Sequence, residues 1–345
     1  MNNFCRNMPK IELHAHLNGS ISQPTMLKLM RYYADSGIED KSNAFINEFQ
    51  IGAGDSRILS IIDCFQFVTI AQSLTRFPEA LKLATLLTLQ EFHEEGCIYI
   101  ELRSTPRNTQ YMTMKQYIET IIEAIRESSL QITLVSKYII SIDRRSAISE
   151  AEKIINLAID SHKQHQDVVV GVELSGDPTV GKFSDFLPAF SRAREAGLKV
   201  TLHCGEICNV EEILEMIEFN PDRIGHGTCI HPDYGGTAET WSALCESKIP
   251  VEVCLTSNIK TKSSPDYSSH HFKKLYEANI PVIICTDDKG VFITSLSQEH
   301  QICADTFNLD ESEMVKITLQ ACNFVFAEGL KDTLQKRIND VMCKN

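Results

Sequence analysis

The sequence predicts an α/β fold, a (β/α)8 TIM barrel, on three observations. Eight strand-like segments alternate with helical segments along most of the chain. Several strand-like segments are almost continuously apolar, as expected for a parallel sheet covered by helices. The 345 residues, 43% hydrophobic and 23% charged, suit a globular barrel with additions. No linker or short repeat divides the chain, so a single domain over residues 1–345 is expected.

The first strand is predicted over residues 10–17 (KIELHAHL), where apolar and polar side chains alternate. A period of two is typical of a strand, because successive side chains point to opposite faces. His14 and His16 therefore share one face and can reach a single metal ion. The pair alone is a weak signal, since polar residues are also ordinary in strands. Asn18 and Gly19 end the run and place both histidines near the end of the strand.

Residues 20–95 predict a mostly helical insertion between the first and second strands. Helical spacing is found over residues 24–34, 43–49, 56–73 and 78–95. This is far more chain than an ordinary connection needs. Two interpretations remain open: the insertion covers a site and excludes water, or it only enlarges the packing of the barrel.

Seven further strands follow, separated by helices. The predicted strands are 97–103, 132–143, 168–174, 198–203, 223–226, 249–255 and 281–286. The predicted helices between and after them are 114–128, 146–162, 183–196, 210–219, 238–246 and 269–278. Residues 309–341 also have a helical pattern and are expected to close the domain as extra C-terminal helices.

The composition excludes several classes of partner. A net charge of −13 argues against nucleic acid or an anionic membrane as the main partner. No apolar run is long enough to span a bilayer, and residues 1–10 lack the apolar core of a signal peptide, so a cytoplasmic location in the cytosol is expected. The 12 cysteines, without a Cys-x-x-Cys pair, are interpreted as reduced thiols. A monomer is expected, although the sequence carries no direct sign of the oligomeric state.

Ionisable and polar side chains gather at the C-terminal ends of the predicted strands. In chain order the groups are His14 and His16, Ser104–Arg107, Asp143, residues 175–177, His203–Glu206, His226, residues 256–258, and Asp287–Asp288. In a barrel these ends converge on one mouth, which is where active sites lie. The sequence therefore predicts a site at this mouth.

Three imidazoles and one carboxylate are a donor set that suits zinc, with a position left for water. His14, His16 and His203 are the natural nitrogen ligands, and Asp287 is the natural oxygen ligand, for one Zn²⁺ per chain. Water on such an ion has its pKa lowered towards ~7. Taken singly, His203 is as well explained as a hydrogen-bonded core histidine. Two adjacent aspartates at a strand end are also found in turns and helix caps, although a ligand role is favoured for Asp287.

Two residues near these ligands are candidates for moving protons. Glu206 follows His203 after a glycine, and a carboxyl group in such a pocket can hold a raised pKa and donate a proton. His226 lies between two glycines and is expected to orient the water or to act as a base. The other histidines receive no role and are expected to be mostly solvated: His93, His162, His165, His231, His270, His271 and His300.

With these residues in place, the chain resembles the adenosine/AMP deaminase family of zinc hydrolases. The matching segments are residues 12–20 (ELHAHLNGS), 174–177 (LSGD), 203–206 (HCGE), 223–227 (RIGHG) and 286–288 (TDD), in the family's order. The forms HLNGS, ELRSTPR and CTDDKGVF are similar to the adenosine deaminase-like branch, which is known as N6-methyl-AMP deaminase. The resemblance covers nearly the whole chain.

The resemblance implies a reaction and its residues. Zinc would be held by the four ligands named above, and N6-methyl-AMP or a related N6-substituted AMP would be hydrolysed to IMP and, from the methyl compound, methylamine. Glu206 would protonate the purine N1 while hydroxide attacks C6, and His226 would orient or deprotonate the water. Asp288 would accept a hydrogen bond, and the backbone N–H of Gly176 would meet the ring. The implied substrate contacts are His16, Asn18, Ser104, Thr105, Pro106, Arg107, Asp143, Gly176 and Asp288.

Asn18 bears most directly on the choice between nucleotide and nucleoside. Adenosine-specific relatives carry Asp at the matching place, and its carboxylate would repel a 5′-phosphate by about 1 to 4 kcal/mol at ~4 Å. The Asn18 amide removes that charge and adds a donor. Ser104, Thr105 and Arg107 are then a plausible phosphate cluster, although a Ser-Thr-Pro-Arg run is equally typical of a plain turn.

Other functions and two departures from the family pattern stay open at this stage. The main alternative is an adenosine deaminase that converts adenosine to inosine and ammonia, against which Asn18 argues. A different metal-dependent barrel hydrolase, acting on a phosphoester or lactam, and a non-catalytic binding protein are further alternatives. Gln72 stands where related chains can carry histidine. Lys289 replaces a proline, and it either helps to neutralise phosphate or is an exposed lysine at a helix start.

Overall fold

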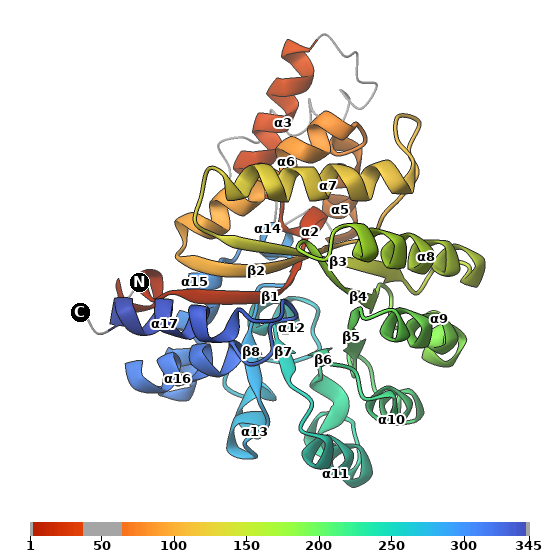
Figure 1. Ribbon diagram of the computed structural model, residues 1–345. Coiled ribbons are helices and arrows are strands. Elements are labelled where there is room, and N and C mark those ends of the chain that lie inside the picture. Colours follow the sequence, from red (N-terminus) through yellow and green to blue (C-terminus); the bar gives the residue numbers. More distant parts are fainter. Residues whose placement is uncertain (1–2, 37–63, 343–345) are drawn as a thin grey trace.

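The computed structural model describes residues 3–36 and 64–342 (Figure 1). The predicted helical segment 43–49 and the first part of segment 56–73 lie outside the described residues.

Eight parallel strands form one sheet whose spatial order, β1 to β8, is the order along the chain. This confirms the prediction of a (β/α)8 barrel, with helices surrounding the strands (Figure 1). The strands are β1 (Lys10–His16), β2 (Cys97–Ser104), β3 (Val135–Asp143), β4 (Val169–Ser175), β5 (Lys199–Cys204), β6 (Arg223–His226), β7 (Val251–Val253) and β8 (Val282–Ile284).

The sheet closes between β8 and β1 through a short bridge at the C-terminal end of the strands. Ala15 and Asp287 pair in parallel, and the N–H of Asp287 donates to the carbonyl of His14 at 2.8 Å. The carboxylate of Glu12 accepts from the backbone N–H of His14 at 2.8 Å and from the N–H of Thr286 at 3.0 Å. A buried side chain therefore supplies hydrogen bonds where the ladder between the two strands is short.

Helices surround the strands, and most of them lie in the connections between strands. Around the barrel they are α1 (Asn3–Asn7), α7 (Met114–Ser129), α8 (Ile148–Gln164), α9 (Phe183–Glu195), α10 (Val210–Phe219), α11 (Ala238–Ser247), α12 (Leu255–Lys260), α13 (Phe272–Glu277), α14 (Lys289–Phe292) and α15 (Leu296–Phe307), with the short 3₁₀ turns η1 (Thr228–Ile230) and η2 (Pro232–Tyr234). Their starts follow capping chemistry: at α7, for example, Thr113 and Gln116 form a capping box.

The insertion after β1 forms α2 (Leu17–Ser20), α3 (Gln23–Asp35), α5 (Cys64–Leu74) and α6 (Pro78–Glu94). Figure 1 shows α3 and α6 stacked with α7 on one side of the barrel. The insertion has an apolar cluster of its own, in which Met26, Leu29 and Ala71 are buried together. Its helices therefore pack on one another as well as on the barrel.

Charged side chains, rather than only branched aliphatic ones, fill the inside of the barrel. Arg103, Arg223 and Glu252 are fully buried, and the Glu252 carboxylate receives both guanidinium groups, at 3.1 Å from Arg103 and 2.5 Å from Arg223. Arg103 also pairs with Glu173 at 3.2 Å, and Arg223 with Glu101 at 2.6 Å. Because each buried charge has an opposite partner, its loss of hydration is compensated. The sequence prediction did not include this network.

The C-terminal segment ties itself to this network. The predicted helical run 309–341 is two helices, α16 (Glu311–Ala321) and α17 (Lys331–Met342), and the chain between them turns onto the barrel. Arg223 donates to the carbonyl of Phe324 at 2.7 Å, and the N–H of Phe326 donates to Glu101 at 2.5 Å. Arg223 is the first residue of β6, so this segment covers the N-terminal end of the barrel, opposite the predicted site.

Several predicted elements were longer than the observed ones; the predicted strand 132–143, for example, begins only at Val135 in β3. The predicted strands 249–255 and 281–286 shorten to β7 and β8, because the chain enters α12 at Leu255 and takes a left-handed turn at Asp287 (φ 60°). The predicted helix 269–278 begins only at Phe272. Residues 254–255 and 285–286, which periodicity assigned to strands, therefore belong to the mouth of the barrel, whereas residues 249–250 and 281 lie at its opposite end.

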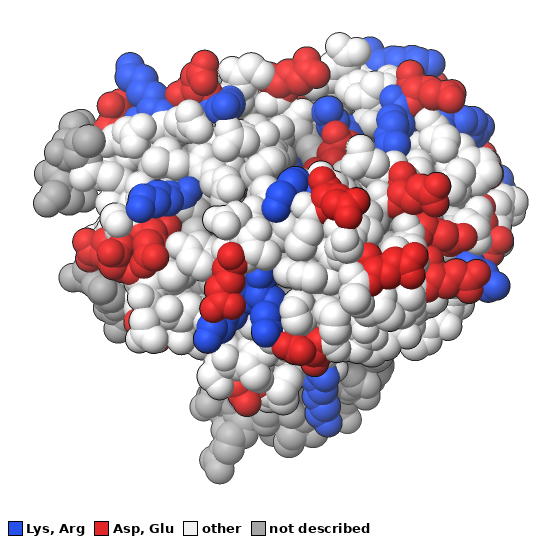
Figure 2. Space-filling view, turned by 90° about the horizontal axis from the view of Figure 1, so that it is seen from below, with Lys and Arg blue, Asp and Glu red and all other residues white. Residues whose placement is uncertain are grey.

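The surface carries mixed charge. On the face shown in Figure 2, acidic and basic side chains are interspersed, and the described residues of this face form no continuous basic area. Within residues 3–36 and 64–342, no helix is both long and apolar enough to cross a membrane.

We expect Arg223→Met to lower the free energy of unfolding by about 3–5 kcal/mol, because it leaves Glu101 and Glu252 as buried charges short of a partner. The measurement is urea denaturation followed by circular dichroism. The matched control is Arg126→Met, which breaks the exposed Arg126–Asp167 pair and should cost less than about 1 kcal/mol. Equal effects of the two variants would contradict a structural role for the buried network.

Candidate metal centre and nucleotide site

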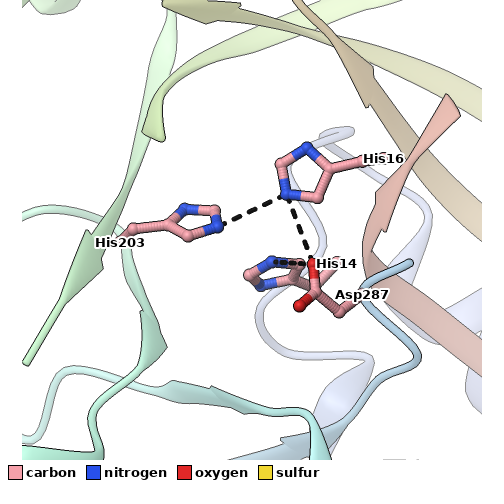
Figure 3. A group of neighbouring side chains, drawn as sticks. All are labelled: His14, His16, His203 and Asp287. Carbon is pink, nitrogen blue, oxygen red and sulfur yellow. Dashed lines mark hydrogen bonds and ion pairs between the residues drawn. The ribbon is translucent and has the colours of Figure 1, made fainter. Parts of the chain in front are cut away.

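Four side chains from three parts of the chain meet at the C-terminal end of the barrel (Figure 3). His14 and His16 come from β1, His203 from β5, and Asp287 from the turn after β8. His16 Nε2 lies 3.3 Å from His203 Nε2 and 3.5 Å from Asp287 Oδ1. His14 Nε2 lies 3.4 Å from the same Asp287 oxygen. The structure thus brings together the four residues that the sequence singled out as a ligand set.

The spacing of these atoms fits a tetrahedral metal ion. Ligand atoms that each lie about 2.0–2.1 Å from one ion are about 3.3–3.4 Å from one another. Three of the six separations between the four candidate ligand atoms, 3.3, 3.4 and 3.5 Å, are close to that value, and all six are within 4.8 Å. Moreover, His14 Nε2 is buried and has no hydrogen-bond partner among the described residues. A metal ligand needs such a free lone pair directed towards the centre of the cluster.

Three of the four candidate ligands have another side chain behind them. His14 Nδ1 lies 2.8 Å from Glu252 Oε2, and His203 Nδ1 lies 3.3 Å from Glu173 Oε1. The hydroxyl of Ser257 donates to the second oxygen of Asp287 at 2.7 Å. Glu252, which is within hydrogen-bond distance of His14 Nδ1, favours a proton on that nitrogen, so that Nε2 of His14 presents its lone pair to the centre.

Glu206 and His226 lie beside the cluster. His226 Nε2 is 3.8 Å from Glu206 Oε1 and 3.8 Å from Asp287 Oδ2. Burial, together with the negative charge of Asp287, raises the pKa of Glu206 to about 8, so its protonated form is available near neutral pH. A bound divalent cation would oppose this shift. The same burial lowers the pKa of His226 to about 3 and keeps its ring neutral.

The backbone around the cluster is unusual. His226 and Asp287 adopt left-handed conformations, with φ of 62° and 60°, which are rare for residues with a Cβ and are often found at functional sites. Two glycines are required by close approach: a Cβ on Gly19 would lie 1.7 Å from Asp288 Oδ1, and one on Gly225 would lie 3.0 Å from His14 Cε1.

Asp288, the first residue past the candidate ligand Asp287, directly precedes α14 and points back over Gly19. Enclosure in the pocket and the charge of Asp287 raise the pKa of Asp288 well above its ordinary value. Asp288 is therefore placed to hold or accept a proton beside the cluster.

Asn18 and Arg107 meet through a residue that the sequence prediction missed, Thr75. The Thr75 hydroxyl lies 3.2 Å from Asn18 Oδ1 and receives a hydrogen bond from Arg107 Nη2 at 2.8 Å. Arg107 also donates to the backbone carbonyl of Gln72 at 3.0 Å. Thr75 directly follows α5, so the insertion contributes to the site. This favours the first of the two interpretations of the insertion, in which it covers the site.

The remaining predicted contacts lie around this group. Ser104 is buried, and its hydroxyl lies 3.0 Å from the hydroxyl of Tyr138. Thr105 and Pro106 continue from Ser104 towards Arg107 along the loop after β2. Asp143 and Gly176 lie against each other across neighbouring strands, since a Cβ on Gly176 would lie 2.4 Å from Asp143 Oδ1.

A second arginine, Arg145, lies near the site and was given no role from the sequence. Its Nε lies 2.9 Å from Asp143 Oδ1, and its guanidinium remains half exposed at the mouth. A short-range signal was available, because Arg145 follows the strand end at Asp143 by two residues.

Two predictions from the sequence were wrong. Lys289 is neither exposed nor free for phosphate: it is buried and pairs with Glu91 of α6 at 2.5 Å, which joins α14 to the insertion. His270, His271 and His300 are buried rather than solvated, with 0–2% of each residue exposed. Lys289, His270 and His271 lie in short polar segments without a periodic signal, so their burial was not visible in the sequence, whereas His300 lies within α15 on its buried face.

The family model for adenosine deaminase matches residues 9–341. The chain belongs to the adenosine deaminase family. It is 40% identical to the human N6-methyl-AMP deaminase over 341 residues, which cover 97% of this chain and 94% of that protein. The zebrafish (Danio rerio) N6-methyl-AMP deaminase is also 40% identical, over 96% of this chain and 95% of that protein.

A solved structure from the same family superposes over the full length. The crystal structure of Arabidopsis ADAL complexed with IMP has a TM-score of 0.86 and 35% sequence identity, and the match covers 99% of both chains. The two chains therefore share one fold over nearly their whole length.

Proposed function

We propose that this protein is a zinc-dependent hydrolytic deaminase that acts at the purine C6 of N6-methyl-AMP, giving IMP and methylamine. The observation that carries the proposal is the cluster of three imidazoles and one carboxylate with 3.3–3.5 Å between ligand atoms, beside Glu206. The names of the human and zebrafish relatives and the IMP complex of the Arabidopsis protein support the substrate.

In this proposal one Zn²⁺ is held by His14, His16, His203 and Asp287. When bound, the ion would lower the pKa of a coordinated water towards ~7 and so supply the nucleophile at neutral pH. Borderline-soft zinc suits nitrogen donors, whereas an oxygen-rich set would favour magnesium or calcium.

The chain's own residues then divide the proton transfers. Glu206 donates a proton to N1 of the purine, which removes aromatic stabilisation from the C6 carbon that water attacks. His226 faces the attacking water from the side of Glu206 and Asp287. Asp288 accepts a hydrogen bond from the purine base or from the attacking water. Collapse of the tetrahedral adduct breaks the bond from C6 to nitrogen. One proton of the attacking water leaves on methylamine, and the other, released from the C6 hydroxyl, restores the proton that Glu206 gave to N1.

The 5′-phosphate is proposed to lie near Asn18, Thr75 and Arg107. Asn18 carries no charge that would repel it, and the Arg107 guanidinium is held in place by Thr75 and Gln72. Ser104, Thr105 and Pro106 shape the loop behind it, while His16, Asp143 and Gly176 lie towards the base and ribose. A charge-assisted hydrogen bond from an arginine is among the stronger contacts that a phosphate can receive.

We expect the protein to bind one zinc ion per chain and Ser257→Ala to weaken this binding about 10-fold or more, because Asp287 loses the hydroxyl that orients its carboxylate. Zinc competition with a chromophoric chelator gives the affinity, and elemental analysis gives the stoichiometry. Ser242→Ala, which loses only a hydrogen bond to Glu246 on the surface, is the control. Two ions per chain would point instead to a different class of barrel hydrolase.

Glu206→Gln should keep its zinc but lose about 10²–10⁴-fold in kcat, because the amide cannot donate a proton to N1 and recover it. Steady-state assays that follow IMP formation, combined with zinc analysis of the same sample, make the measurement. An active, zinc-loaded Glu206→Gln enzyme would remove Glu206 from the role of proton donor.

Asn18→Asp should lower kcat/KM for N6-methyl-AMP at least about 10-fold while changing turnover of N6-methyladenosine little, since the new carboxylate repels phosphate by about 1 to 4 kcal/mol at ~4 Å. Comparing both substrates on one preparation isolates the effect of the phosphate. An Asn323→Asp variant, which adds the same charge on the surface, is the control. Equal losses for nucleotide and nucleoside would count against the proposed position of the phosphate.

A further inference from the structure

His226 is held from behind by three residues that have no assigned role. Asn258 lies on α12, and His270 and His271 lie just before α13. All three are buried, with 2%, 0% and 1% of each residue exposed. The His270 and His271 rings stack with centroids 4.2 Å apart. Their hydrogen bonds form a chain whose direction can be worked out from one unambiguous donor.

That donor is the backbone N–H of Phe272, which lies 3.0 Å from His270 Nδ1. A backbone N–H can only donate, so His270 Nδ1 presents a lone pair. A neutral imidazole has one proton, and in His270 it must therefore be on Nε2. Burial also lowers the pKa of His270 well below its ordinary value, in agreement with a neutral ring.

The proton on His270 Nε2 determines the orientation of the Asn258 amide. Nε2 lies 3.0 Å from Asn258 Oδ1, and only an oxygen can accept from it. The NH₂ group of Asn258 then faces the other way, towards Ser263 Oγ at 3.1 Å and His226 Nδ1 at 3.3 Å. The two orientations of an amide cannot be told apart by shape, but this network permits only one of them.

The Asn258 amide in turn determines where the proton of His226 lies. Since Asn258 donates towards His226 Nδ1, that nitrogen is an acceptor and the ring proton is on Nε2. Nε2 is the nitrogen that faces Glu206 and Asp287. Protonation of both ring nitrogens would place two donors against each other at Nδ1, so the same contact opposes a second proton on the ring.

His271 acts on the backbone of the same residue. Its Nε2 donates to the carbonyl of His226 at 2.8 Å, which helps to hold the left-handed conformation of His226 (φ 62°). The contact with Asn258 therefore fixes the ring orientation and the proton position of His226, and the contact with His271 helps to fix its backbone conformation.

We propose that Asn258 and His270 are positioning residues that keep the proton of His226 on Nε2, so that His226 donates a hydrogen bond to the attacking water rather than removing its proton. This inference rests on the proposed function for the identity of the reaction, and it decides between the two roles, orienter or base, that the sequence left open. The arrangement of the proton itself is a property of the folded chain and can be measured without substrate.

The direct test is ¹⁵N NMR of histidine-labelled protein, both metal-free and zinc-loaded, with His226 assigned by its loss in His226→Gln. The expected result is a protonated Nε2 and an unprotonated Nδ1 in His226. A protonated Nδ1 in the wild-type protein would overturn the proposal. Because no turnover is needed, a chain that shows the expected proton position but does not deaminate N6-methyl-AMP would support the arrangement while rejecting the proposed function.

Asn258→Asp tests the relay at nearly constant volume. The carboxylate accepts from both neighbours, so the proton of His226 should move to Nδ1, and kcat should fall about 10²-fold or more with KM changed less than about threefold. Wild-type kcat in a variant that shows the moved proton would overturn the catalytic part of the proposal. Asn323→Asp, exposed and remote, controls for the added charge.

A pair of variants at His270 separates positioning from folding. His270→Gln keeps a donor at the place of Nε2, whereas His270→Phe removes it, and both lose the acceptor for the Phe272 N–H. We expect His270→Gln to keep the wild-type proton position and kcat within about threefold, and His270→Phe to lose both. Equal kcat and equal His226 spectra in the two variants would contradict the relay, and thermal melts of both show whether they share any loss of folding.

Discussion

The carboxylate of Glu252 is the point at which the fold and the site meet. One oxygen accepts from Arg223 at 2.5 Å and from the Thr201 hydroxyl at 3.1 Å, and the other accepts from Arg103 at 3.1 Å and His14 at 2.8 Å. Burial opposes the charged form, but Arg103 and Arg223 hold the pKa of Glu252 well below its ordinary value. A permanent negative charge therefore stands behind a ligand imidazole and sets which of its nitrogens faces the cluster. The same charge ties together strands β1, β2, β5, β6 and β7.

The buried charges around Glu252 are linked to both ends of the barrel. Towards the N-terminal end of the strands, Arg223 and Glu101 hold the segment between α16 and α17 against the barrel. Towards the other end, His226 and Asp287 turn the backbone into left-handed conformations that direct their side chains to the centre. Such conformations persist only where surrounding contacts determine them, and here Ser257, Asn258 and His271 supply those contacts. The insertion completes the site by placing Thr75 between Asn18 and Arg107.

The sequence predicted the parts of this structure that depend on periodicity and on strand ends. Alternation over residues 10–17 placed His14 and His16 on one face, and the rule that parallel strands of a barrel end at one mouth brought in His203, His226 and Asp287. The fold prediction was confirmed, and the grouping of the ligands matches the geometry, while their binding of zinc stays a prediction.

The parts that could not be predicted depend on long-range pairing of single residues. Glu252 looks like a solvent-facing residue of a short strand until Arg103 and Arg223 are seen opposite it. Lys289 looked like an exposed lysine because its partner Glu91 is 198 residues away in the sequence. His270 and His271 lie in a polar stretch without periodicity, and only the fold brings them behind His226.

The central claim is that three imidazoles and one carboxylate from distant parts of the chain bind a single zinc ion. Anomalous diffraction at the zinc edge from crystals of the zinc-loaded protein tests it most directly. The account predicts one peak per chain, about 2.0–2.1 Å from Nε2 of His14, His16 and His203 and about 2.0–2.2 Å from an oxygen of Asp287. A peak bound elsewhere, or two peaks that share these ligands, would contradict it.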